Sequence, residues 1–342
     1  MIRIRINIFR ACRGVLRLNI LGGGLGERGV IELVTSLQER MKGNPLPFGD
    51  DVAAIRLGGG RLGVLKCDML VEATDVPPGM SLWQASRKAV VSSVSDFAAK
   101  GVRPKVILAS LGLPKGLGED EIRQIGSGLN AAAREYGAYI IGGDTNEAEC
   151  LTIDICLFGV CGEKILVRRD TAKDGDVVAV TGPFGLAPLG LKIIKEGLEA
   201  PQELRARALE SVYMPKARLV EGVALASRRL LTSSIDSSDG LAWSLYELAR
   251  ASGVGFEIDR LPVDGDVERF ALENNIDHVD LTLYGGEEYE LVVTLSPRML
   301  GRARGKVSLI PIGRVTGDVG RLTLRVEGKV LDIEPKGYEH LR

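Results

Sequence analysis

Two aspartates separated by two serines stand directly before a helix-like run, and this arrangement constrains how the chain around them can fold. Asp236 and Asp239 are three residues apart, and the run 241–252 follows them. At that spacing both carboxylates can face one pocket at a helix N-terminus, where backbone N–H groups and the helix dipole favour phosphate. Carboxylate oxygens also suit Mg²⁺, the usual companion of a nucleoside triphosphate. The alternative is an ordinary N-cap with a second, solvated aspartate.

Further aspartates stand beside predicted strands. Asp50 and Asp51 precede a short strand, and a three-glycine turn then leads into the strand 62–67. This pattern predicts a β-hairpin. Asp68 follows the second strand directly, so its carboxylate is a candidate metal ligand beside the acidic loop. A plain turn aspartate is the alternative.

Two more aspartates interrupt apolar or glycine-rich segments. The segment 83–100 has helical periodicity, and Asp96 lies on its apolar face. A carboxylate on a buried face needs a hydrogen-bonding partner or a cation. The strand 138–141 runs into Gly-Gly-Asp-Thr at 142–145, which predicts a glycine turn where a ligand approaches the backbone beside Asp144. A plain β-turn is the alternative.

The composition is that of a globular protein with a substantial hydrophobic core. Its charge is balanced, so any phosphate ligand would be bound by local groups rather than by the overall charge. The chain has 342 residues, of which 45% are hydrophobic and 26% charged, and strand and helix patterns alternate through both halves. These values predict two domains of α/β (α+β) class, divided near residues 162–164. The net charge of −1 gives no bulk attraction to nucleic acid or to an anionic membrane.

The cysteines and the N-terminal residues carry no motif of their own. None of the five cysteines forms a C-x-x-C pair, so we expect reduced thiols in a cytoplasmic protein rather than a zinc site. Residues 1–25 are expected to be an extension outside the functional core; an edge strand, a loose tail and a mis-assigned start are alternatives. A G-x-G-x-x-G match at 24–29 lacks the second strand of a dinucleotide-binding fold, and no P-loop sequence is present.

The candidate residues favour direct phosphoryl transfer without a covalent intermediate. Neither of the two histidines belongs to a Ser–His–Asp pattern, and there is no reactive-cysteine signature. An aspartate-rich site without a protein nucleophile suits in-line transfer, in which metal ions neutralise charge and the protein positions the reactants.

Five motifs follow one another along most of the chain. They are GDDVA at 49–53, VSDFAAKG at 94–101, GGDT at 142–145, IDSSDGL at 235–241 and GGEEYEL at 285–291. In order and spacing they resemble those of thiamine-monophosphate kinase, a family related to aminoimidazole ribonucleotide synthetase, selenophosphate synthetase and the hydrogenase-maturation carbamoyl dehydratase. The resemblance implies ATP-dependent phosphorylation of thiamine monophosphate to thiamine diphosphate, with several Mg²⁺ ions bridging the phosphate chains. It also implies a homodimer whose N-terminal domains share a β-barrel, with C-terminal α/β sandwiches outside.

The resemblance implies a role for each matching position. The metal ligands would be Asp51, Asp68, Asp96, Asp144, Asp236 and Asp239. ATP would contact Gly143, Asp144, Arg169 and Ser238, and the thiamine end would contact Asp75, Glu287 and Tyr338. Residues 26–163 would form the domain that binds ATP and metal, and residues 164–342 a second domain with a substrate-contacting tail. Neither nucleic acid nor a membrane is an expected partner.

Three positions depart from the family pattern. Lys66 and Cys67 replace hydroxyl ligands and are poor ligands for Mg²⁺, so one metal position is expected to be lost, or Lys66 to contact phosphate. Asp75 stands where the family has a substrate-contacting histidine, and Glu288 stands where it has an aspartate. A relative acting on another acceptor and a nucleotide-binding paralogue without turnover are the alternatives.

Overall fold

The computed structural model describes residues 26–326 and 328–341, which belong to two compact units. The described part of the first unit comprises residues 26–39 and 339–341, and the second unit runs from Arg40 to Tyr338. The predicted N-terminal extension, residues 1–25, lies outside the described residues. In the first unit, helix α1 (Glu27–Ser36) begins after Gly26, and the backbone N–H of His340 donates to the Glu27 carboxylate at 3.1 Å.

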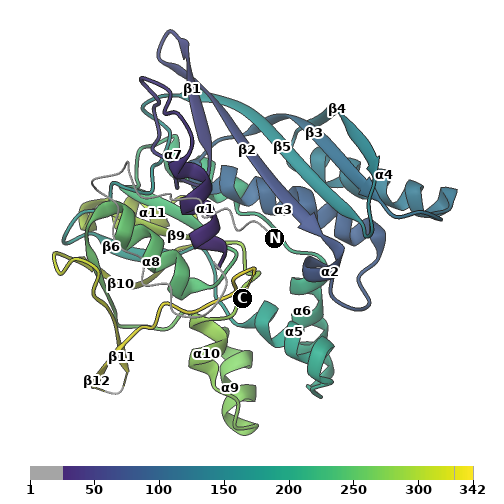
Figure 1. Cartoon of the computed structure of the whole chain (residues 1–342). Coiled ribbons are helices and arrows are strands. Elements are labelled where there is room, and N and C mark those ends of the chain that lie inside the picture. The colour runs from purple at the N-terminus through teal and green to yellow at the C-terminus, as the bar shows by residue number, and fades with distance from the viewer. Residues whose placement is uncertain (1–25, 327, 342) are drawn as a thin grey trace, which may run out of the picture. The chain divides into compact units, whose positions relative to one another are not determined.

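Five strands form a mixed sheet in the N-terminal half of the second unit (Figure 1). They are β1 (Ala53–Gly58), β2 (Arg61–Val71), β3 (Pro104–Leu113), β4 (Tyr139–Glu147) and β5 (Thr152–Gly162). Their order is β1-β2-β5-β3-β4, and β3 and β4 are the parallel pair. Helices α3 (Leu82–Lys100) and α4 (Glu119–Glu135) cover one face of this sheet (Figure 1), and the short α2 (Glu72–Asp75) follows β2.

Helix α3 is buried on several sides because other helices pack closely on it. It begins with a capping box between Ser81 and Gln84 and ends at Gly101, whose φ of 69° an L-residue rarely adopts. A Cβ at Gly222, in α7 (Leu219–Ala226), would lie 1.9 Å from the Ala98 carbonyl oxygen. Glycine is therefore required for α7 to approach α3, and this contact joins the two halves of the unit.

Among the residues that the structure describes, none covers the other face of the five-stranded sheet, which we call the open face. Large apolar side chains on it are between 41% and 63% exposed, namely Ile55, Leu57, Met69, Leu108, Tyr139 and Ile141. Strand alternation places these residues opposite the buried ones that face α3. Six exposed large apolar side chains on one sheet face make it a candidate contact surface.

Seven strands form the second mixed sheet, in the order β12-β11-β8-β10-β6-β9-β7. The strands are β6 (Val177–Val180), β7 (Ser233–Ser237), β8 (Gly255–Ile258), β9 (Glu290–Leu295), β10 (Ile310–Thr316), β11 (Leu322–Val326) and β12 (Lys329–Asp332). The other helices are α5 (Leu186–Glu196), α6 (Gln202–Tyr213), α8 (Leu241–Ser252), α9 (Gly265–Glu273), α10 (His278–Leu283) and α11 (Pro297–Arg304). Among the residues described, no helix has both the length and the apolar character needed to cross a membrane.

The two mixed sheets with their helices confirm the predicted α/β (α+β) class. The predicted hairpin and the predicted helices at 83–100 and 241–252 are also confirmed. The glycine turn predicted at 142–145 is wrong, because β4 continues through these residues. A Cβ at Gly143 would lie 1.7 Å from the Ala109 carbonyl oxygen, so this glycine allows β3 and β4 to approach. Asp68 likewise lies inside β2 rather than at its end.

Candidate metal and phosphate site

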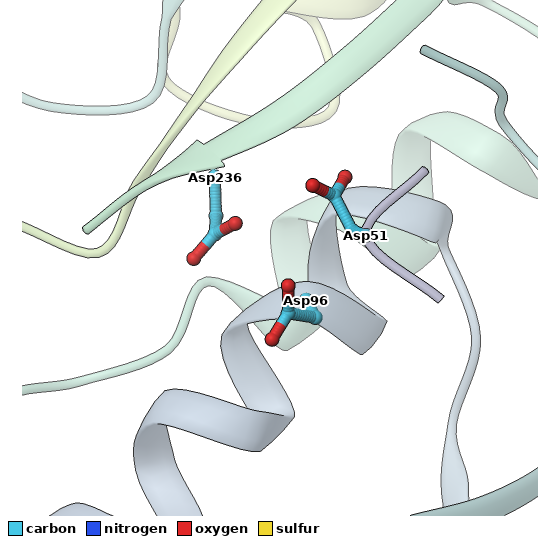
Figure 2. A group of neighbouring side chains, drawn as sticks. All are labelled: Asp51, Asp96 and Asp236. Carbon is cyan, nitrogen blue, oxygen red and sulfur yellow. The ribbon is translucent and has the colours of Figure 1, made fainter. Parts of the chain in front are cut away.

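Three aspartates from separate elements bring their carboxylates together (Figure 2). Asp51 precedes β1, Asp96 lies on α3 and Asp236 lies on β7, and all three are buried. One carboxylate oxygen from each lies within 4.8 Å of the other two. We call these residues the aspartate group. Oxygen donors at this spacing fit a hard divalent cation such as Mg²⁺.

The backbone holds each member of the aspartate group in place. Asp236 pairs with Leu291 in the ladder between β7 and β9. Asp96 is fixed by the long, buried helix α3. The N–H of Asp51 donates to the side chain of Asp50 at 2.8 Å, which fixes the turn before β1. Each of the three carboxylates therefore extends from a segment that is held in place by its own contacts.

Lys66 reaches the aspartate group from β2. Its Nζ lies 2.9 Å from Asp96 Oδ2 and 4.0 Å from Asp68 Oδ1. Burial alone would lower the pKa of Lys66, but these two carboxylates raise it, so the ammonium stays charged. Burial raises the pKa of Asp96 well above its usual value against the opposing effect of Lys66, and burial also raises the pKa of Asp236. A further cation would stabilise the charged form of both carboxylates.

Two more basic side chains lie on the other side of Asp51. Lys100 is fully buried, and its Nζ lies 2.7 Å from Asp50 Oδ1 and 2.6 Å from Asp51 Oδ2. It also donates to the Ser234 carbonyl oxygen at 2.9 Å. Arg169, which the family resemblance predicts to contact ATP, donates through its guanidinium to the Asp51 carboxylate. Arg169 is therefore next to the aspartate group.

Asp144 and Gly143 lie away from the aspartate group of the same chain. Across the sheet, Asp144 pairs with Ser110, Ser110 with Asp154, and Asp154 with Met69. Residues paired in this way point to the same face of a sheet, so Asp144 shares the open face with Met69. Lys66 faces α3 on the opposite side, and the structure thus separates Asp144 from the other predicted ligands.

The turn after β7, the loop before β9 and the tail after β12 bring four predicted site residues side by side. The N–H of Glu287 donates to the Ser238 carbonyl oxygen at 2.6 Å, and the N–H of Tyr338 donates to that of Asp239 at 3.0 Å. Asp239 is in the turn, while Asp236 is in the strand before it, and Asp239 is outside the aspartate group. Two distant motifs thus meet at one edge of the second sheet.

Asp75 closes the turn at the end of β2. Its Oδ2 accepts the N–H of Val71 at 2.7 Å, and its carbonyl oxygen accepts a hydrogen bond from Lys88 Nζ at 2.8 Å. Lys88 also donates to both carboxylate oxygens of Glu287. Asp75 and Glu287, two residues predicted to contact the thiamine end, are thus linked through one lysine.

A pocket of about 270 Å³ lies beside this linkage. Glu287 lines it together with Met214, Lys216 and Arg218. A cavity that combines apolar and charged side chains in this way can hold a small polar organic ligand. It adjoins the loop before β9, which carries two of the predicted motif residues, Glu287 and Glu288.

Comparison with known proteins identifies the family. The model described as AIR synthase related protein, N-terminal domain, matches residues 49–161, and the corresponding C-terminal domain model matches residues 173–323. A thiamine-monophosphate kinase from Nitrosopumilus maritimus is 38% identical over 284 residues, which cover 82% of this chain and 89% of that protein. This chain belongs to the thiamine-monophosphate kinase family.

Two further members of the thiamine-monophosphate kinase family match over similar lengths. The enzyme of that name from Pyrococcus abyssi is 38% identical over 296 residues, covering 86% of this chain and 90% of that protein. A solved structure of AaThiL complexed with AMPPCP and TMP has a TM-score of 0.81 and 28% identity, and it covers 96% of this chain and 100% of that chain. The likeness extends over both sheets.

Sequence reasoning did not single out Lys88 and Lys100 as site residues. Both lie on α3, and both are buried, at 2% and 0% exposure. Neither lysine stands out in the sequence, because α3 also carries serines, an arginine and an aspartate, but once buried each ammonium requires an acidic partner. Which acid it meets is decided by tertiary structure.

Proposed function

We propose that this chain transfers the γ-phosphoryl group of ATP to thiamine monophosphate, giving thiamine diphosphate and ADP. The observation that carries the proposal is the buried aspartate group, at the position of the family motifs, in a member of the thiamine-monophosphate kinase family. The complex of AaThiL with AMPPCP and TMP supports the same pair of substrates.

Asp51, Asp96 and Asp236 would hold Mg²⁺, because they present three carboxylate oxygens within 4.8 Å of one another. When bound, the ion supplies positive charge that offsets the charge of phosphate oxygens. Lys100 holds Asp51 from the opposite side, so that this ligand is already oriented. Asp68, next to Lys66 on β2, and Asp239, in the turn after β7, would be further carboxylates of the metal site.

The remaining predicted residues would position the two substrates. Arg169, which contacts Asp51, and Ser238, in the turn that follows Asp236 on β7, would contact ATP. Glu287 and Tyr338 would hold the thiamine end, and Asp75 would shape the same region through Lys88. The pocket beside Glu287 supports this arrangement, since it offers a carboxylate to a ligand that carries a positively charged ring.

The open face of the five-stranded sheet would pack against the same face of a second copy of the chain. Ile141 and Met69 are 63% and 61% exposed there, and burying such side chains in a shared β-barrel would be favourable. Gly143 and Asp144 lie on β4, and Asp144 points to this open face, so a homodimer would carry this part of β4 to the subunit boundary. That location supports contact between Asp144 and nucleotide or metal bound by the partner chain.

The proposed chain organisation follows the two sheets. The N-terminal domain would end near residue 163, because β5 ends at Gly162, and the C-terminal domain would begin at residue 164. The tail that includes Tyr338 would belong to the second domain, where its backbone bonds to Asp239.

The direct test is to incubate the protein with thiamine monophosphate and Mg²⁺-ATP and to separate the products by chromatography. Thiamine diphosphate and ADP in equal amounts, in excess over enzyme, are expected. Thiamine without phosphate should give no thiamine diphosphate under the same conditions. Asp236→Asn should abolish product, while Asp332→Asn, at an exposed position on β12, should not. ATP binding without product would instead favour another acceptor or a protein without turnover.

A further inference from the structure

Lys66 places a fixed ammonium inside a cluster of carboxylates. Alternation along β2 points Lys66 toward α3, and its side chain is only 20% exposed. Its Nζ lies 2.9 Å from Asp96, a member of the aspartate group, and 4.0 Å from Asp68. The lysine therefore occupies space between two predicted metal ligands.

The basic side chains at this site offset part of its negative charge before any ion binds. Among the residues that the structure describes, the carboxylates joined there are Asp50, Asp51, Asp68, Asp96 and Asp236, and the basic groups in contact with them are Lys66, Lys100 and Arg169. Glu247, which Arg169 also approaches, is paired with Arg250. Five acids against three bases leave two negative charges, which one divalent ion would neutralise.

We propose that Lys66 takes the place of one divalent cation, so that its ammonium, rather than a second metal ion, neutralises Asp96 and Asp68. The inference rests on the proposed kinase function and concerns how that same site is charged. An ammonium has three N–H donors, so contact with Asp96 leaves donors that can face a phosphate oxygen. Unlike a metal ion, it is held by the chain and needs no free Mg²⁺.

The consequence for metal binding is specific. Without nucleotide, the chain should bind a single divalent ion tightly, at the aspartate group. Lys66→Thr removes the ammonium and supplies a hydroxyl oxygen, a donor that suits Mg²⁺ or Mn²⁺. This variant should therefore bind one more ion per chain than the natural protein does.

The experiment counts bound Mn²⁺ per chain by electron paramagnetic resonance of the free ion during titration. The natural protein, Lys66→Thr, Lys66→Arg and the control Lys105→Thr are compared; Lys105 is exposed on β3 of the same sheet. Lys66→Thr should gain one ion, while Lys66→Arg and Lys105→Thr should match the natural protein. Equal counts in natural protein and Lys66→Thr would overturn the proposal.

The natural protein provides a second test if Lys66→Thr does not fold. Two or more tightly bound Mn²⁺ ions per chain without nucleotide would contradict the proposal, and one would support it. The count does not depend on turnover. Failure to form thiamine diphosphate would therefore refute the kinase function and leave the metal count as a separate result.

Discussion

Lys88 donates to both carboxylate oxygens of Glu287, at 2.7 and 2.6 Å, and so joins α3 to the loop before β9. The backbone of Glu287 has a φ of 69°, which is uncommon for a residue other than glycine. A conformation of this kind persists only where surrounding contacts hold it. The ion pair and the bond from the Glu287 N–H to the Ser238 carbonyl oxygen supply such contacts.

Lys88→Met should therefore weaken binding of thiamine monophosphate more than binding of ATP. The variant leaves Glu287 without its buried cation and releases the carbonyl oxygen of Asp75, so both residues lose their positions. We expect the KM for thiamine monophosphate to rise about tenfold, equivalent to ~1.4 kcal/mol, with little change in the KM for ATP. Steady-state kinetics with each substrate varied in turn would measure this.

Two variants control for charge and for the loss of a lysine in general. Lys88→Arg keeps the cation and should recover part of the affinity. Lys192→Met breaks a surface pair with Glu196 on α5, which should change neither KM because exposed ion pairs contribute little. Equal rises in both KM values for Lys88→Met would show that Lys88 maintains the fold rather than the position of Glu287.

Asp236→Asn should make the protein more stable and inactive at once. Burial raises the pKa of Asp236, so its charged form is unfavourable in the absence of a cation, and the neutral amide removes this cost. In the presence of a chelator the Tm should rise by about 2–4 °C, as expected for a gain of roughly 1 kcal/mol. Product formation should fall by at least about a hundredfold.

The measurement is a pair of melting curves with and without Mg²⁺. Natural protein should gain stability from the ion, and Asp236→Asn should not. Asp332→Asn, at an exposed position, should behave like the natural protein in both. A lower Tm for Asp236→Asn in chelator would mean that the carboxylate makes a stabilising contact that outweighs its burial.

Of the aspartate group, Asp96 could be singled out because an aspartate on an apolar helix face needs a cation or a hydrogen-bonding partner, whereas Asp51 and Asp236 were singled out by their motifs. The arrangement of the group was not predictable. The sequence predicts β4 but not that β5 and β3 lie between it and β2, and this strand order separates Asp144 from Asp96. Lys100 could not be matched to Asp50 either, because their contact joins a helix end to a loop about fifty residues earlier. Strand register and long-range ion pairs are properties of the assembled fold.

Asp75 should tolerate replacement by asparagine better than by alanine. Its Oδ2 accepts the Val71 N–H, and an amide oxygen can do the same. Asp75→Asn should keep the KM for thiamine monophosphate within about threefold, whereas Asp75→Ala should raise it by about tenfold. Asp75→His, which supplies the residue of the family pattern, should retain or improve use of this substrate. Complete loss of activity in Asp75→His would favour a different acceptor.

A charged residue on the open sheet face should prevent dimer formation. Ile141→Glu places a carboxylate where the proposed homodimer would bury it, and burial of an unpaired charge is costly. Size-exclusion chromatography with light scattering should show a dimer for the natural protein and a monomer for the variant. Leu272→Glu makes a similar change at a residue that is 62% exposed on α9, and it should remain dimeric. A monomeric natural protein would refute the shared barrel.

Glu288 should make stability depend on pH. Burial raises its pKa from 4.5 to about 8, while the N–H of Gly185, at the start of α5, opposes the shift and Glu290 adds to it. Below pH 4.5 the carboxyl is protonated in both folded and unfolded chains. As the pH rises from 4.5 to about 8, the unfolded chain loses this proton while the folded chain keeps it, so the free energy of unfolding falls. Above about 8 both are ionised and the effect levels off.

Glu288→Gln removes this dependence but keeps an oxygen that accepts the Gly185 N–H. Its stability relative to the natural protein should therefore increase as the pH rises toward about 8 and then stay constant, at a slope of up to ~1.4 kcal/mol per pH unit. Urea denaturation of both proteins between about pH 5 and about pH 9 would measure the difference. Glu273→Gln, at an exposed position on α9, controls for the change in net charge. A constant difference across this range would mean that Glu288 ionises at its ordinary pKa and is not held protonated by burial at the start of α5.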